Sequence, residues 1–351
     1  MDKRMSLLKE LCDAFGPSGC EGNVADIIKR ELSGLCDEVV CLRDGSVIAK
    51  LNGDGSTDKR FMLNAHMDEV GFMVTHIDDE GYLHVCNVGG IDPRVICGRR
   101  VVFGDENRRV KGIVASKAIH QQTQSERAEA TPIDAMYVDI GATDKEDAEK
   151  HVKVGDFGTF DCDFVEFGNG KLRAKAIDDR LGCAAMIDVL KTINKKGIKL
   201  PFDLYCAFST REEIGGMGAL MCSYKIDPHV GIVIESTAVS DVDGTPEHCC
   251  VGTQGEGGCI SLLDYSSIYD SDFVDYAMNI GKKNNIKCQL KRFVSGGNDA
   301  RHLQRSRAGA LVLAISAPTR YIHTPSNVIS ISDYHSICDL VYAIVTEYDQ
   351  F

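Results

Sequence analysis

Apolar residues recur at helical spacing near the start of the chain and predict two amphipathic helices, at 5–15 and 24–32. A Gly/Pro-rich turn separates them. Short apolar runs follow and predict strands at 38–44, 46–53, 60–65, 71–77 and 81–89. From there to about residue 168, turn residues are frequent and helical spacing is scarce. This middle stretch is therefore typical of an all-β module.

Beyond residue 170 the pattern changes, because near-continuous apolar runs alternate with segments of helical spacing. The predicted helices cover 180–196, 216–225, 270–285, 299–306 and 332–348. The predicted strands cover 171–177, 201–208, 231–234, 287–293 and 310–316. Such alternation is typical of a mostly parallel sheet with helices on its faces. We therefore expect an α/β domain at 1–69 and 166–351, interrupted by a β-rich insert at 70–165.

The composition excludes several classes of partner. A chain of 351 residues is long for a single domain, in keeping with the two expected here. Its 39 basic and 52 acidic residues give a formal net charge of −13, which leaves no large basic face for a nucleic-acid backbone. No apolar run approaches the ~18 residues that cross a bilayer. We expect neither nucleic acid nor a membrane as a partner.

The cysteines point to a reducing environment. Their number, 15, is odd, no two have CxxC spacing, and the first residues predict a charged helix rather than a signal peptide. We therefore expect a cytoplasmic protein with free thiols. Without CxxC pairs, zinc fingers and thioredoxin-like chemistry are excluded, so a metal site would need His, Asp and Glu ligands.

Acidic and imidazole side chains follow several predicted strands. These residues are His66, Asp178, Glu212, Glu213, Glu235 and His323. Taken singly, a histidine after a strand is more often structural, Asp178 could cap the following helix, and Glu212 with Glu213 could be a solvated pair. In open α/β sheets, however, ligands bind beyond the carboxyl ends of the strands, where all of these residues are expected to meet. Their joint position favours a metal site.

The types of donor atom limit which metal ions the site could bind. A mixed set of imidazole and carboxylate ligands suits Zn²⁺, Co²⁺ or Mn²⁺. The carboxylates are too many for one tetrahedral zinc ion, whereas two ions that share one carboxylate would account for the surplus.

With these residues identified, the chain resembles the family of tetrahedral, deblocking and glutamyl aminopeptidases, dinuclear metallo-exopeptidases of which some members carry the name endoglucanase or cellulase. Six segments show the resemblance, in the order and spacing of the family: AHMDEVGFMV, MYVDIGA, KAIDDRLG, REEIGGMGA, SGGNDARHLQRS and ISAPTRYIHTPSNVIS. It extends over nearly the whole chain and implies a zinc-exopeptidase-like α/β fold with a small all-β domain inserted.

The resemblance also implies a ligand set for two divalent ions per chain. We expect these ions to be Zn²⁺ or Co²⁺, with Mn²⁺ as the alternative. Asp178 would bridge both ions. His66 and Glu235 would complete the first site, and Glu213 and His323 the second. Many relatives have Asp at the position of Glu235; glutamate is an equally good oxygen ligand that is one methylene longer.

The implied reaction is hydrolysis of an N-terminal peptide bond by a hydroxide that the two metals activate. Glu212 would be the general base, which takes the proton of the water and passes it to the leaving amine. Asp68 would accept a hydrogen bond from the imidazole of His66 and fix its tautomer. The resemblance further implies a cis peptide bond between Asp178 and Asp179.

The expected substrates are short peptides with a free N-terminus; the preferred first residue stays open. The resemblance implies that the insert is an oligomerisation domain and that dimers assemble into a tetrahedral dodecamer. The apolar faces of the strands at 71–77 and 81–89 are expected to seek a partner.

Two other functions compete with this interpretation. A glycoside hydrolase of the endoglucanase type needs no metal and usually has aromatic platforms, but this chain has no Trp and 7% aromatic residues. A non-catalytic oligomeric binding protein on the same scaffold would have lost a ligand or the base, and none is missing.

Overall fold

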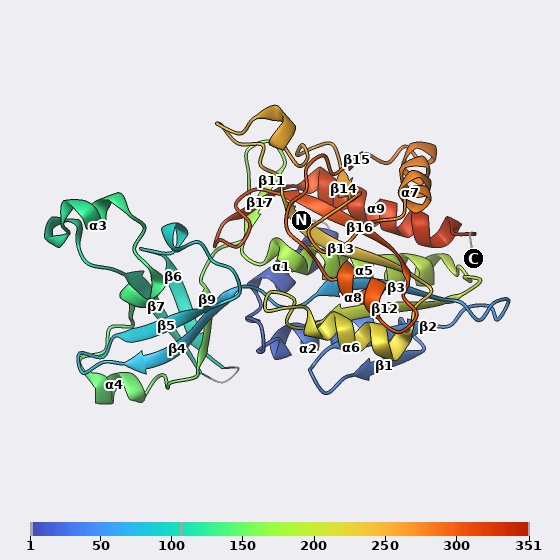
Figure 1. The fold of residues 1–351 in the computed structure, drawn as a ribbon. Helices are drawn as coiled ribbons and strands as arrows, with labels where there is room; N and C mark the ends of the chain where they lie inside the picture. Colours follow the sequence, from blue (N-terminus) through green and yellow to red (C-terminus); the bar gives the residue numbers. More distant parts are fainter. Residues whose placement is uncertain (1–2, 106–107, 350–351) are drawn as a thin grey trace.

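An eight-stranded sheet forms the centre of the larger part of the molecule in the computed structural model, which describes residues 3–105 and 108–349 (Figure 1). Its strands are β1 (Glu38–Cys41), β2 (Val47–Leu51), β3 (Arg60–His66), β12 (Asp203–Ser209), β13 (Val230–Ala238), β14 (Gly258–Ile260), β15 (Cys288–Leu290) and β16 (Leu311–Thr319). Their order is β1-β2-β12-β3-β13-β16-β14-β15. The central strands β12, β3, β13 and β16 are parallel, so their carboxyl ends share one edge.

Helices flank this sheet. They are α1 (Lys3–Asp13), α2 (Gly22–Leu32), α5 (Ile177–Lys196), α6 (Met217–Ile226), α7 (Ser271–Lys283), α8 (Ala300–Arg305) and α9 (Ile331–Glu347). Helix α5 contacts β3 and β13 and also α1, α2 and α9. Every residue from Ile177 to Ile187 is buried, because this part of α5 lies between the sheet and other helices.

Six further strands close into a barrel that projects from one side of the main sheet (Figure 1). They are β4 (Gly71–Ile77), β5 (Leu83–Val88), β6 (Arg100–Gly104), β7 (Arg109–Ala115), β8 (Tyr137–Asp139) and β9 (Phe157–Phe160). The barrel has a hydrophobic core of its own, separate from the core around the main sheet. Because closure pairs β4 with β9, the first and last strands of the barrel are not left as open edges.

The expectation that apolar strand faces in the insert seek a partner is wrong for β4 and β5. Phe72 and Val74 point into the barrel core, as do Leu83 and Val85. A bulge after Val74 shifts the register of β4 against β5. The barrel thus covers these faces itself.

The insert also contains two helices that the sequence pattern did not reveal, α3 (Gln124–Ala128) and α4 (Lys145–Glu149). With five residues each, they are too short to show a helical period. Local capping supports both: Thr123 forms a capping box with Glu126, and the side chain of Asp144 accepts from Asp147 N.

A small antiparallel sheet joins two distant parts of the chain. It consists of β10 (Val165–Phe167), β11 (Lys171–Ala174) and β17 (Asn327–Ser330). β11 runs towards Asp178 and β17 follows closely after His323, so their pairing brings these two residues near each other. Strands β14 and β17, with three and four residues, were not predicted.

The predicted fold class is confirmed: a mostly parallel sheet flanked by helices, with a small β structure inserted into the chain. The domain limits at residues 70 and 165 stay a prediction. Within the described residues, no helix is both long and apolar enough to cross a membrane.

Candidate metal centre

The predicted site residues meet at the carboxyl edge of the central strands. His66 is the last residue of β3 and lies opposite Ser209, the last residue of β12. Glu212 and Glu213 follow β12 directly, while Glu235 lies within β13. Parallel pairing therefore places these side chains along one edge, as the sequence pattern predicted.

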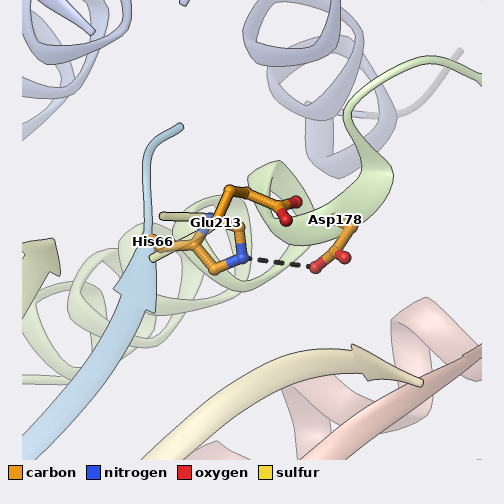
Figure 2. A group of neighbouring side chains, drawn as sticks. All are labelled: His66, Asp178 and Glu213. Atoms are coloured by element: carbon orange, nitrogen blue, oxygen red, sulfur yellow. Dashed lines mark ion pairs between the residues drawn. The ribbon is translucent and has the colours of Figure 1, made fainter. Parts of the chain in front are cut away.

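The carboxylate of Asp178 faces two imidazoles. Its Oδ1 lies 3.3 Å from Nε2 of His66, and its Oδ2 lies 3.4 Å from Nε2 of His323. On the His66 side, Glu235 Oε2 is 3.9 Å from the same Nε2. On the His323 side, Glu213 Oε2 is 3.2 Å from Nε2. Figure 2 shows His66 at the end of β3 and Asp178 at the start of α5 pointing toward one another, with Glu213 beside them.

These donors fit divalent cations. Asp178 Oδ1 and Glu235 Oε1 are buried and receive no hydrogen bond within the described part of the chain. Donor atoms of His66, Asp178 and Glu213 all lie within 4.8 Å of one another. Buried carboxylate oxygens without partners are costly, and a bound cation would satisfy them. The imidazole and carboxylate donors are those that Zn²⁺, Co²⁺ and Mn²⁺ accept.

Asp179 also lies in this group, which sequence reasoning missed. One of its oxygens is within 4.8 Å of donor atoms of His66 and Glu235. However, its Oδ2 accepts from His66 N at 3.2 Å and its Oδ1 from Gly182 N at 3.0 Å. Because both oxygens already have partners, Asp178 is the better candidate for a bridging ligand. The peptide bond between Asp178 and Asp179 is cis.

The site has an excess of negative charge. Burial lowers the pKa of His66, but the facing carboxylates outweigh it and raise the pKa well above its usual value. Burial is likewise outweighed at His323, where Asp178 and Glu213 raise the pKa to about 11. Burial raises the pKa of Glu235 well above its usual value. The group therefore attracts positive charge, as protons or as metal ions.

Asp68 contacts Nδ1 of His66 through its backbone oxygen, at 3.1 Å, and through its carboxylate, which also has several other hydrogen-bond donors. Its fully buried carboxylate has Oδ1 3.3 Å from Nδ1 of His66. The same Oδ1 accepts from Glu212 N at 3.0 Å, and Oδ2 accepts from Glu213 N at 3.1 Å. Burial raises the pKa of Asp68, but His66 and the other donors outweigh this and lower it. Asp68 thus connects the end of β3 to the loop after β12.

Glu212 lies in an environment that favours the protonated form of its carboxyl group. Its pKa is raised well above the usual value by burial and by the nearby charge of Asp299. Asp299 is fully buried and accepts from Asn64 Nδ2 and Ser209 Oγ, both at 2.9 Å. Sequence reasoning gave Asp299 no role, although it lies in SGGNDARHLQRS, one of the segments that show the family resemblance.

Comparison with known proteins shows to which family the chain belongs. The sequence model of the M42 glutamyl aminopeptidase family matches residues 45–340. FrvX of Escherichia coli K12 is 31% identical over 344 residues, 97% of this chain and 95% of FrvX. A crystal structure of a TET aminopeptidase from a marine-sediment thaumarchaeote superposes with a TM-score of 0.95 at 35% identity and covers 99% of this chain and 97% of its own.

The TET1 peptidase of Pyrococcus horikoshii, which can assemble into a tetrahedron or a large octahedral shell, superposes with a TM-score of 0.88 at 29% identity. The match covers 99% of this chain and all of that one (100%). The resemblance drawn from the six sequence segments is confirmed: this chain belongs to the M42 glutamyl aminopeptidase family and is a peptide hydrolase.

Proposed function

We propose that this protein is a dinuclear metal-dependent aminopeptidase that removes N-terminal residues from short peptides. The observation that supports this most directly is the carboxylate of Asp178, which faces the Nε2 atoms of both His66 and His323. A further carboxylate, Glu235 or Glu213, lies on each side. Membership of an aminopeptidase family supports the same function.

In this proposal Asp178 would be a ligand of two divalent ions. His66 and Glu235 would complete the ligands of one ion, and Glu213 and His323 those of the other. When bound, such ions act as Lewis acids that lower the pKa of water and polarise a peptide carbonyl. Zn²⁺, Co²⁺ and Mn²⁺ all suit the donors.

The protein's own side chains orient the metal ligands and transfer the protons. A proton on Nδ1 of His66 is donated towards Asp68, which leaves the lone pair of Nε2 facing Asp178. Glu212 takes the proton of the attacking water and delivers it to the leaving amine. Burial and the charge of Asp299 raise the pKa of Glu212 above its usual value, and a carboxylate with a raised pKa holds a proton more readily before it returns it.

We also propose that residues 70–165 form a separate domain that takes part in self-association, to a dimer and further to a dodecamer. The assembly of the TET1 relative supports this. Ile113 in β7 is 53% exposed and Ile119, in the segment between β7 and α3, is 60% exposed, and large apolar side chains of this kind are common at subunit contacts. A closed assembly would admit short peptides and exclude folded proteins, which fits a cytoplasmic role.

The test combines metal analysis with peptide assays. We expect about two divalent ions per chain, release of N-terminal residues from short peptides, loss of this activity with a chelator and its return with Zn²⁺ or Co²⁺. Substrates with acidic, basic and apolar first residues would define the preference. Carboxymethylcellulose serves as the substrate for the glycoside hydrolase alternative. Peptide hydrolysis that survives complete metal removal would contradict the proposal, and a metal-loaded protein without activity on any substrate would favour a binding protein.

A further inference from the structure

The turn between α1 and α2, residues 16–21, is hydrogen-bonded to a segment that contributes to the metal centre. Ser18 N donates to Glu69 O at 3.2 Å, and Glu69 N donates to Gly16 O at 3.1 Å. Pro17 and Glu69 form an isolated parallel bridge. The turn is thereby fixed against the segment that follows β3, which contains Asp68.

Ser18 reaches the loop after β12 through Asp68. Its side chain is buried and its hydroxyl donates to Asp68 Oδ2. The same carboxylate accepts the backbone N–H groups of Glu212 and Glu213. The Ser18 hydroxyl therefore restrains the carboxylate that binds two consecutive amides of that loop.

Glu21 accepts a hydrogen bond from the backbone N–H of Arg211, the residue before Glu212 in the same loop. Its buried carboxylate accepts from Gly19 N at 2.8 Å, within the turn, and from Arg211 N at 3.2 Å, both through Oε1. Arg211 has φ 58°, a left-handed conformation that side chains other than glycine rarely adopt and that needs support from its surroundings. Glu21 supplies such support.

Three consecutive backbone N–H groups, those of Arg211, Glu212 and Glu213, thus bind two buried carboxylates that the turn carries or restrains. We propose that Ser18 and Glu21 are positioning residues of the metal centre, which hold this loop so that the side chains of Glu212 and Glu213 reach their working positions. The part that concerns Glu212 as a base rests on the proposed function. The part that concerns Glu213 as a metal ligand is measurable without a substrate.

If a residue only stabilises the fold, its replacement lowers the melting temperature without changing the metal centre of the molecules that remain folded. The matched control is Ser223→Ala, because Ser223 is also fully buried and donates to a backbone oxygen, that of Ala219, at 2.7 Å within α6. Both serine variants are assayed as full chains, loaded with Co²⁺, well below their melting temperatures.

For Ser18→Ala we expect kcat to fall at least about tenfold, with KM within about twofold of wild type, since positioning acts on the reacting groups. The visible absorption spectrum of bound Co²⁺ should shift, because Glu213 is displaced. Ser18→Thr keeps the hydroxyl and should restore most of kcat and the spectrum. Ser223→Ala should match wild type in both.

Glu21 provides a second test if Ser18→Ala fails to fold. Glu21→Gln keeps the shape and one acceptor oxygen and should stay within about threefold of wild-type kcat, whereas Glu21→Ala should lose at least about tenfold and change the Co²⁺ spectrum. Wild-type kcat and an unchanged spectrum in Ser18→Ala and Glu21→Ala, with lower melting temperatures alone, would overturn the inference. If wild type hydrolyses no peptide, the proposed function fails, but the Co²⁺ spectra still decide the inference.

Discussion

The metal centre and the barrel use their strands in opposite ways. In the main sheet, the parallel strands β12, β3 and β13 place polar side chains at one edge, where helices and loops converge on them. In the barrel, the antiparallel strands use their edges for closure and their inner faces for a core that includes Phe72 and Phe103. Both groups of metal-type donors found among the described residues lie at the main sheet.

An open parallel sheet leaves a polar edge available for chemistry, whereas a closed barrel leaves only its outer surface and its loops. One buried cluster links the two regions. Thr159 Oγ1 of the barrel donates to Glu69 Oε2 at 2.7 Å, and Glu69 Oε1 lies 2.7 Å from Lys175 Nζ and 3.2 Å from Arg180 Nη2. The following substitutions test how independent the two regions are.

Replacing the shared carboxylate should have the largest effect. Asp178→Asn removes the charge that faces both imidazoles, so we expect loss of both metal ions and a fall in kcat/KM of at least about 10³-fold. Elemental analysis and peptide kinetics measure this. Asp134→Asn, at an exposed position in the turn before β8, is the matched control and should change neither quantity. Loss of only one ion from Asp178→Asn would contradict its bridging role.

A cavity in the barrel core should destabilise the barrel and spare the metals. Phe103→Ala removes a fully buried ring, at a cost of about 3–5 kcal/mol in the free energy of unfolding of the barrel. We expect weaker self-association in light scattering, with metal content retained. Release of the metals at the denaturant concentration that unfolds the barrel would show instead that the two regions unfold as one unit.

Replacing Glu212, the proposed base, should slow the reaction without emptying the metal site. Glu212→Gln keeps the size of the side chain but cannot accept the proton, so kcat should fall by at least about 10²-fold with both metals bound. Steady-state kinetics on metal-quantified samples measure it. Near-normal activity at full metal content would exclude Glu212 as the base.

The contact between the two regions should give the smallest effect. Thr159→Val keeps the shape but removes the hydroxyl that donates to Glu69 Oε2, and should cost about 1 kcal/mol in the free energy of unfolding. Equilibrium denaturation measures it, with kcat as the second readout. A change in kcat of more than about threefold would show that the barrel influences the reacting groups through this contact.

The order of the longer helices and strands around the main sheet could be predicted from the sequence alone, and so could the side chains that follow strand ends. These features depend on local spacing: the helix of α5 and the strands β3, β12, β13 and β16 were all predicted, and His66, Glu213 and Glu235 were expected at one edge. The family was also readable from the sequence, because its motifs are continuous segments. The roles of the individual site residues stay predictions.

Contacts between groups that lie far apart in the sequence could not be predicted, because they depend on how the whole chain folds. Short strands such as β14 and β17 have too few residues for a period and exist because neighbouring strands satisfy their backbone groups. Closure of the barrel depends on the pairing of β4 with β9. The hydrogen bond between Arg211 N and Glu21 joins residues 190 positions apart. Such a contact cannot be predicted from the local spacing of apolar residues, because it forms only when the whole chain has folded.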